Sequence, residues 1–435
     1  MRNTILHSAL KISMEGVDPY DNQEINPVTE ETIVHVDEVL EEAREDSAVV
    51  EEHDEAIDEL SQAADSLESL ITSLESAIAD GGLSPQAADI HSRAVAIATR
   101  RLPIDAGEFT VSVESFGGTG DKLQASMEAM EGAKALLSKI WEAIRSAFVG
   151  AWNAIKNFFA TMGKSGPAVV AAGQSLKKRA QDAKGIKPAQ TKISLNNAQF
   201  NYLITDGKFT PVASLTAINT GYDIGVKQYT SKIISNLNPL YQAIERGELS
   251  PQRLDEAASK VDLKSALPDD MKGKLPGGHF FHMVLSKAYV NGGTDLEVLA
   301  GASLKFDQDK AALVKNGQAL EFDVLTVEEI SKLADQIIEM GKLITSSKAV
   351  AGLVEKSIQQ SAKAGNKLVS KEKTLSKEES AAAKKVLNAL NKAARLSTGC
   401  SHQYLSYMGS AAKGAVSFGT QCLKQYTKAA KKAEA

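Results

Sequence analysis

The clearest alternation of hydrophobic and polar positions covers residues 36–79. Apolar side chains recur there in steps of three and four residues, at Ile57, Leu60, Ala64, Leu67, Ile71, Leu74 and Ile78. This spacing puts one apolar seam along an α-helix whose remaining surface is mostly acidic. Gly81-Gly82 ends that helix, and Ser84-Pro85 supplies a capping hydroxyl and a first-turn proline for a second helix. We therefore predict an acidic helical hairpin, with a second helix that packs through Ala87, Ile90, Ala94, Ile97 and Ala98.

A glycine-rich segment, residues 109–120, separates this hairpin from a second helical pattern that contains both tryptophans of the chain. Its apolar stripe includes Ile140, Trp141, Ile144, Phe148, Trp152, Ile155, Phe158 and Phe159. The polar face carries Lys134, Lys139, Arg145 and Lys156 against Glu142. A cationic amphipathic helix of this kind can pack in a protein core or lie in a membrane interface. Since an aromatic stripe at helical spacing is usually core, we expect core packing.

The second half of the chain has a mixed pattern followed by a helical one. Residues 165–192 predict a basic helix that leads into a flexible connector. Prolines punctuate residues 193–326, where short strands are expected at 279–285, 302–306 and 319–325. Two long helices follow, over 326–371 and 376–432, and predict a C-terminal hairpin. The alanine-rich final helix suggests close packing on one side and a basic outer face on the other.

These patterns predict a mainly α protein of four segments. Residues 1–114 form an acidic segment that contains the coiled helical hairpin, and residues 115–192 form the amphipathic aromatic helix and a basic connector. Residues 193–326 form a small mixed α+β domain, and residues 327–435 form a basic, long helical hairpin. An aromatic content of only 5% agrees with helices packed through small side chains.

Charge divides the chain more sharply than hydropathy does. The formal net charge of −6 is the sum of two unequal parts. Residues 1–114 hold 26 acidic and 6 basic side chains, a net charge of −20, and residues 115–435 hold 29 acidic and 43 basic ones, a net charge of +14. A basic body often binds a polyanion, although two solvated helical faces of opposite sign would produce the same count.

No group of residues in the sequence has the pattern of a catalytic or metal site. His279 and His282 have no neighbouring cysteine or carboxylate that would complete a metal set. Cys400 and His402 are two residues apart, so on a helix their side chains point away from each other. We therefore predict no enzyme activity, no cofactor and no metal. We also expect neither a signal peptide nor a membrane-spanning segment.

One short motif connects the charge division to a known family. Residues 112–117 read Ser-Val-Glu-Ser-Phe-Gly, and Met-Glu-Ala-Met-Glu-Gly follows at 127–132, leading into the aromatic helix. This layout, over the first third to two-fifths of the chain, resembles internal head proteins of giant phiKZ-like tailed phages. The prohead protease of such phages cuts after a small residue, any residue and then Glu. The resemblance implies a cleavage site formed by Ser112, Val113, Glu114 and Ser115.

The same motif also ends at other glutamates. Glu15, Glu128 and Glu131 are secondary candidates for cleavage, and matches ending at Glu68 and Glu75 fall on the acidic helix, where we expect them to be inaccessible. Glu114 is favoured over all of these because it lies in a glycine-rich segment, and a protease binds its substrate in an extended conformation.

The resemblance implies a virion structural protein that is assembled in the host cytoplasm and matured inside the capsid. The acidic segment would be a propeptide, and the basic body would be packaged with the genome. Its partners would be the prohead protease, double-stranded DNA bound without sequence preference, and other head proteins. Two alternatives remain: a membrane-active effector that uses the tryptophan-rich helix, and an uncleaved cytoplasmic helical scaffold.

Overall fold

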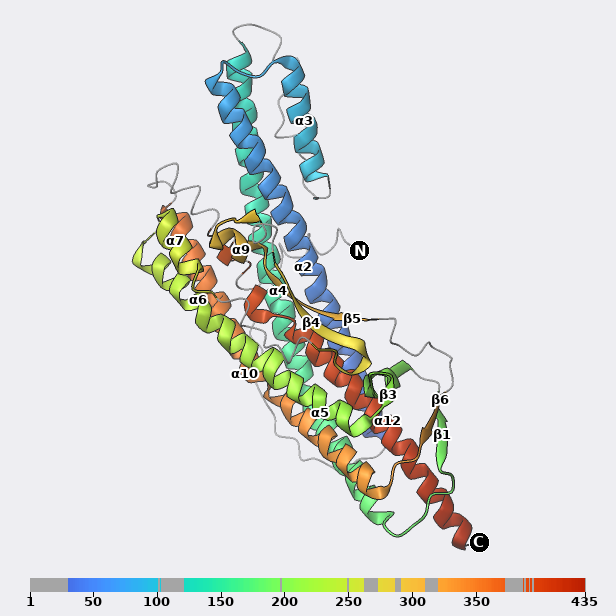
Figure 1. The fold of residues 1–435 in the computed structure, drawn as a ribbon. Coiled ribbons are helices and arrows are strands. Elements are labelled where there is room, and N and C mark those ends of the chain that lie inside the picture. Colours follow the sequence, from blue (N-terminus) through green and yellow to red (C-terminus); the bar gives the residue numbers. More distant parts are fainter. Residues whose placement is uncertain are drawn as a thin grey trace. The chain divides into compact units, whose positions relative to one another are not determined.

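The computed structural model describes residues 30–100, 102, 121–195, 198–248, 250–261, 273–285, 291–309, 320–371 and, with short gaps, 386–434. Within these ranges the chain is mainly helical, as the sequence predicts. The helices are α2 (Glu30–Ala79), α3 (Pro85–Thr99), α4 (Asp121–Asp182), α5 (Pro211–Tyr222), α6 (Tyr229–Arg246), α7 (Pro251–Ala258), α9 (Asp295–Gly301), α10 (Val327–Lys371) and α12 (Ser401–Glu434) (Figure 1). The strands are β1 (Lys192–Leu195), β2 (Ile204–Thr205), β3 (Lys208–Phe209), β4 (His279–Val284), β5 (Ser303–Gln308) and β6 (Leu320–Asp323).

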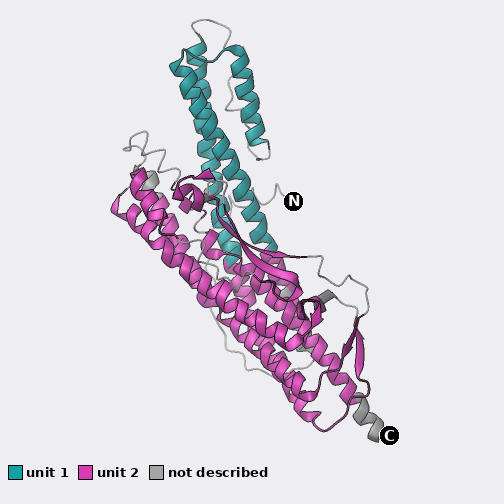
Figure 2. Ribbon diagram, in the orientation of Figure 1, with its two compact units in different colours: residues 1–22, 48–155 teal, residues 23–47, 156–435 magenta. Residues whose placement is uncertain are grey.

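The chain forms two compact units (Figure 2). Unit 1 comprises residues 1–22 and 48–155, and unit 2 comprises residues 23–47 and 156–435. Helices α2 and α4 each pass from one unit into the other. The division of the chain into four segments, at residues 114, 192 and 326, stays a prediction.

Unit 1 is built from α3 and parts of α2 and α4. The apolar seam predicted for α2 is buried, and Leu67 and Leu74 are completely inaccessible to solvent. The hairpin turn also follows the prediction: Gly81 and Gly82 have positive φ angles, and the Ser84 hydroxyl accepts a hydrogen bond from the Ala87 N–H at 3.2 Å. A Cβ on Gly82 would lie 2.8 Å from the Lys122 carbonyl carbon, so this turn has no room for a side chain.

The packing face predicted for α3 was wrong. Ala88, Val95 and Thr99 are buried, whereas Ile90 and Ile97 are 68% and 74% exposed. The helix is therefore rotated so that its small side chains face inward. His91 accounts for part of this rotation. Its ring is hydrogen-bonded to the backbone of Leu70 in α2, so its side chain lies on the side of α3 that faces α2.

Helix α4 joins the aromatic helix and the basic helix predicted from residue 165 into one element. It continues through Gly163, Gly166 and Pro167 to Asp182. The glycines permit a close crossing with α10: a Cβ on Gly166 would lie 2.8 Å from the Gly341 carbonyl oxygen. Small residues at a helix crossing let the two backbones approach, so the glycines favour packing here rather than flexibility.

Unit 2 is a helical bundle with three small β-ribbons. Helix α10 packs against α5, α6 and α12, and the pair of α10 with α12 is the predicted C-terminal hairpin. The expected strands are present as β4, β5 and β6: β4 pairs with β5 and β6 with β1, both antiparallel. Phe281 of β4 lies opposite Phe306 of β5, and both side chains are buried.

Two expectations about the final helix were wrong. A turn at Gly399-Cys400 interrupts the helix expected over 376–432, because Gly399 has φ +52° and packs so closely that a Cβ would lie 2.9 Å from the Tyr229 ring. Nor does α12 present a basic outer face. Most of its positions from Ser401 to Tyr426 are buried, including Ala411, Ala412 and Ala415, and the less buried side of this range holds only two cations, Lys413 and Lys424.

Candidate functional site

The acidic helix α2 is held to α4 by an apolar seam. One hydrophobic cluster of unit 1 joins them, and its α2 members are Ile57, Leu60, Ala63, Ala64, Leu67, Ile71 and Leu74. From α4 it takes Ala125, Ala129, Ala133, Leu136, Leu137, Ile140, Ile144, Ala147 and Ala151, which we call the α4 seam face. Ala88 and Val95 of α3 complete the cluster. Burial of such aliphatic side chains stabilises by about 1.5–3 kcal/mol for each large one, so this contact is substantial.

A histidine of α2 packs directly on a glycine of α4. A Cβ on Gly150 would lie 2.6 Å from Cε1 of His53, so the imidazole ring rests directly on the α4 backbone. Burial lowers the pKa of His53, against the opposing effect of the carboxylates of Glu52 and Asp54. The ring is therefore neutral at pH 7 and serves as a flat packing surface.

Polar contacts fix the part of α2 that belongs to unit 2. The Thr161 hydroxyl of α4 donates a hydrogen bond to the Asp46 carboxylate at 3.0 Å, and Arg44 donates to the Ser410 hydroxyl of α12 at 3.0 Å. Ala43 and Ser47, which flank Arg44 and Asp46 in the sequence, are buried. The acidic helix is thus an integrated part of the fold and contacts both α4 and α12.

Five of the eight residues in the predicted aromatic stripe are buried: Ile140, Ile144, Ile155, Phe158 and Phe159. Trp141 and Phe148 are half-buried and pack against the cluster of unit 1, and Trp152 is also half-buried. In unit 2 the Phe158 ring makes an edge contact with His402, 6.1 Å between ring centroids. The stripe is occupied by protein along its length, which leaves a lipid surface little to contact. Across the part of the chain that the structure describes, no helix is long and apolar enough to cross a bilayer.

The predicted cleavage residues fall in two classes. Ser112, Val113, Glu114, Ser115 and Glu15 lie outside the described residues. The secondary candidates Glu128 and Glu131 are exposed, but both are within helix α4. A helical backbone does not fit the extended substrate channel of a protease.

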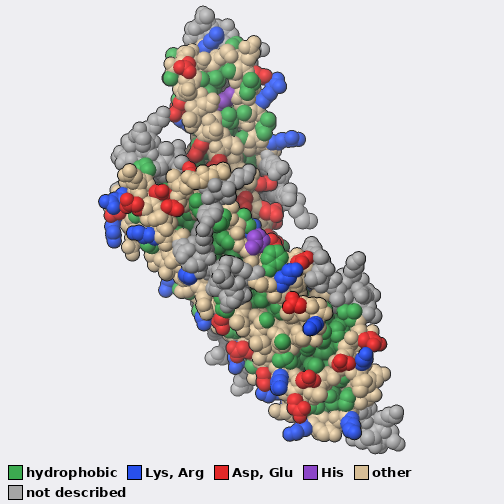
Figure 3. Space-filling model, in the orientation of Figure 1, with side chains coloured by type: hydrophobic (Ala, Val, Ile, Leu, Met, Phe, Trp, Pro, Cys, Tyr) green, Lys and Arg blue, Asp and Glu red, His purple; other side chains and the backbone are tan. Residues whose placement is uncertain are grey.

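Exposed cations gather where α4 ends. Residues 177–187 hold five basic side chains and one acidic one, and Lys178, Arg179, Lys184 and Lys187 are exposed. We call these four residues the α4 terminal patch. The neighbouring Lys177 is instead paired with Asp335 of α10, 2.7 Å from Nζ to Oδ1. Elsewhere on the face shown in Figure 3, acidic and basic side chains of unit 2 are interspersed. The sequence predicts a basic helix over this region, but not that the four side chains of the α4 terminal patch are exposed together where α4 ends.

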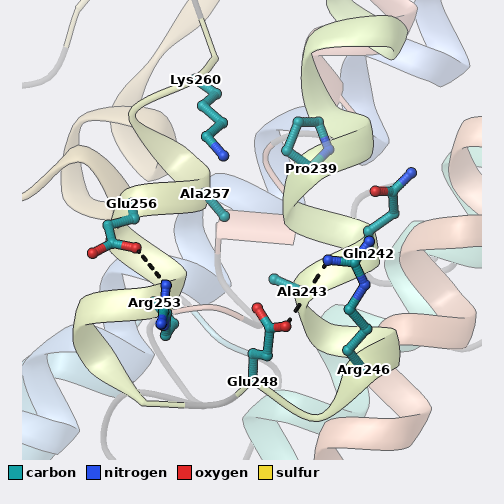
Figure 4. A pocket seen from close by; sticks show the side chains of 9 residues that line it. All are labelled: Pro239, Gln242, Ala243, Arg246, Glu248, Arg253, Glu256, Ala257 and Lys260. Carbon is teal, nitrogen blue, oxygen red and sulfur yellow. Dashed lines mark hydrogen bonds and ion pairs between the residues drawn. The ribbon is translucent and has the colours of Figure 1, made fainter.

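A cavity of about 410 Å³ lies between α6 and α7 (Figure 4). Its charged lining residues are Arg246, Glu248, Arg253, Glu256 and Lys260. Arg253 Nη1 lies 3.2 Å from Glu256 Oε2, and Arg246 Nη1 lies 4.0 Å from Glu248 Oε1. Since each arginine already has a carboxylate partner and all four side chains are exposed, the cavity has little excess charge with which to select a ligand.

Two residues considered for chemistry in the sequence, His279 and Cys400, are buried in the fold. The ring of His279 stacks on Tyr202 and Phe306, and burial lowers its pKa to about 4. Burial also raises the pKa of the Cys400 thiol far above its ordinary value, which leaves it protonated and a poor nucleophile. Among the described residues, no group of three or more side chains could hold a metal ion.

Comparison with known proteins identifies the family. The family model of phiKZ-like phage internal head proteins matches residues 35–421, which include both the acidic hairpin and nearly all of unit 2. No curated protein and no solved structure gives a significant match. The resemblance noted at the motif of residues 112–117 covered less than half of the chain, whereas the family match covers most of it. The chain therefore belongs to the phiKZ-like phage internal head proteins, a family of the virion interior.

Proposed function

We propose that this internal head protein is synthesised as a precursor, is cut after Glu114 by the prohead protease, and persists in the head as a basic body beside packaged DNA. One observation carries the proposal: the change of net charge from −20 to +14 coincides with a motif of the type that the protease cuts. That motif lies between the end of α3 and the start of α4. A cut there separates the two charge blocks without interrupting a described helix.

The described helices favour Glu114 over the other candidates. Glu128 and Glu131 belong to the first turns of α4, and unwinding them would detach residues of the α4 seam face from their cluster. The matches that end at Glu68 and Glu75 are on α2, where the middle residue of each motif, Leu67 or Leu74, is completely buried. A cut at these positions requires local unfolding of a described helix.

Electrostatics supply the reason for removing the acidic segment. A chain of net charge −6 is repelled by DNA, whereas a body of +14 neutralises phosphates and releases their counterions. The exposed cations of the α4 terminal patch are the best-defined contact surface for this purpose. Binding of this kind is independent of sequence and weakens as salt rises. The protein then acts as a structural component of the head rather than as an enzyme.

Mass spectrometry of purified virions tests the cleavage. We expect a mature N-terminus at Ser115, and a Glu114→Gln substitution should retain the uncut chain in the particle. An Asp105→Asn substitution removes a charge from the same connecting segment without touching the motif and should leave cleavage intact. Abundant protein that begins near Met1 would refute the proposal. An N-terminus at Ala129 or Gly132 would move the cut to a secondary site.

A further inference from the structure

The proposed cut has a consequence for the α4 seam face. Every residue that covers this face in the hydrophobic cluster of unit 1 precedes Glu114: the covering side chains come from α2 and α3, with Leu83 and Leu102 at the margin. Once residues 1–114 are removed, the only members of that cluster left are those of α4. Leu136, Ile140 and Ile144, which are no more than 1% exposed in the precursor, would then face water.

An uncovered face of this size attracts a new partner. It extends from Ala125 to Ala151, which at 1.5 Å per residue is a strip of about 40 Å. Contiguous apolar surface of this extent marks an interaction site in a soluble protein. Five of its nine residues are alanine, and such small side chains allow another helix to approach closely.

The charges around the face indicate which partner fits. Residues 121–155 of α4 hold four acidic and four basic side chains, so this half of the helix is neutral. The covering helix α2, by contrast, holds 17 acidic side chains and one basic one. Two precursors that approach through this region repel each other through α2, whereas the neutral halves of α4 in two trimmed bodies add no repulsion of their own. A neutral apolar strip also offers nothing specific to DNA, which needs cations.

From these observations we infer that removal of the acidic segment turns the α4 seam face into a docking surface for the same face of a second copy. The inference rests on the proposed function in one respect, that residues 1–114 are removed during maturation. If residues 1–114 are removed, cleavage both changes the net charge of the body and starts its self-association. The acidic helix therefore covers a self-association surface in addition to opposing DNA binding.

A cysteine on the covered face tests the inference directly. The full chain receives a recognition sequence for a site-specific protease after Glu114, together with Ala133→Cys on the α4 seam face. The matched control carries Ala135→Cys, two residues away on the exposed side of α4. The native Cys400 and Cys422 are buried and provide the same background in both chains. Thiol labelling reports whether the face is uncovered, and oxidative cross-linking with light scattering reports whether two bodies pair.

We expect the thiol introduced at position 133 to be protected in the uncut chain, labelled in the separated and dilute trimmed body while it is monomeric, and protected again once the dimer forms. The trimmed body should then shift from the mass of a monomer to that of a dimer, and cross-link through position 133 but not through position 135. Adding Ile140→Glu should return it to a monomer. A thiol at position 133 that stays protected in a monomeric trimmed body would overturn the inference, as would one that is labelled in a body that stays monomeric.

A further arm adds anionic phospholipid vesicles to the trimmed body. Flotation with the vesicles in place of dimer formation would overturn the inference in favour of a lipid partner. Because the protease site is engineered, these results hold or fail whatever the natural N-terminus in the virion turns out to be. Failure of the inference and failure of the proposed cleavage are therefore distinguishable.

Discussion

The two units bury their helices in different ways. In unit 1, α2 contributes a single apolar seam, and its other faces carry acidic side chains. In unit 2, α12 is covered on nearly every side, and its tyrosines take part in an aromatic cluster with Phe281, Phe306 and His279. We expect that removing a helix attached through one seam leaves its neighbour folded, whereas removing a helix covered on nearly every side does not. This difference supports the proposal that the acidic helix, and not α12, is the segment removed.

Spectroscopy can follow the two units separately. Trp141 and Trp152, the two tryptophans of the chain, belong to unit 1. The buried tyrosines Tyr222, Tyr229 and Tyr404 belong to unit 2. Tryptophan fluorescence therefore reports on unit 1, and the tyrosine bands of near-ultraviolet circular dichroism report mainly on unit 2.

The largest effect is expected at Tyr404. Its ring is completely buried and stacks on Phe281 at 5.3 Å, and its hydroxyl donates a hydrogen bond to the Ile218 carbonyl at 2.7 Å. Tyr404→Ala should lower the free energy of unfolding of unit 2 by about 4 kcal/mol in urea titrations followed by circular dichroism. Tyr404→Phe removes only the hydrogen bond and should cost about 1 kcal/mol. Equal effects of the two substitutions would contradict this account of the core.

The crossing of α4 with α10 comes next. Gly166→Ala introduces a Cβ against the backbone of α10 and should cost unit 2 about 3 kcal/mol, because neither helix can move away without breaking other contacts. Gly352 provides the matched control: it lies in α10 with open space around its Cα, so Gly352→Ala should stabilise by about 0.5–1 kcal/mol through helix propensity. If both alanines stabilise the protein, the crossing is looser than described.

Substitutions on the two arms of the acidic hairpin should differ by a similar amount. Leu67→Ala creates a cavity in the seam and should lower the stability reported by tryptophan fluorescence by about 2.5 kcal/mol, with little change in the tyrosine signal. Ile97→Ala, on the exposed face of α3, should change it by less than about 0.5 kcal/mol. A larger loss at Ile97 would restore the packing face that was predicted from sequence.

A smaller effect, in pH dependence, is expected from His279. Burial lowers its pKa from 6.5 to about 4, so the folded state binds its proton less tightly than the unfolded state does. The stability that this difference supplies is complete above pH 6.5 and is lost as pH falls toward 4, with a loss of about 2 kcal/mol by pH 5. His279→Phe should remove this part of the pH dependence from the tyrosine signal. An unchanged pH profile would show that the pKa of the ring is the same in the folded and unfolded states.

The sequence predicts unit 1 better than unit 2. On α2 the large residues Ile57, Leu60 and Leu67 recur with helical spacing, and only one register buries them all. On α3 the largest apolar side chains are Ile90, Val95 and Ile97, and the choice between faces depends on His91, whose bond to α2 no periodicity reveals. For α12, alanine and glycine fit either a surface or a crowded interior, so composition does not indicate burial on all sides.

The candidate site is predictable only in part, for a similar reason. A charge count and a three-residue motif locate the expected cut, since both are written in the sequence itself. The α4 seam face is harder to predict. The sequence shows an apolar stripe from Ile140 to Phe159, but it does not show which helix packs against that side of α4. That α2 covers α4 depends on contacts between residues far apart in the sequence, such as His53 with Gly150.

We propose that the acidic segment keeps the basic body from binding a polyanion. The affinity of the protein for DNA before and after cleavage tests this claim most directly. The chain with the engineered protease site is titrated with double-stranded DNA, uncut and after separation of the fragments, from about 50 mM to 200 mM salt. We expect the separated body to bind much more tightly than the intact chain at low salt, with an advantage that shrinks as salt rises. Equal affinities of the two forms at low salt, or a body that does not bind DNA at all, would contradict the claim.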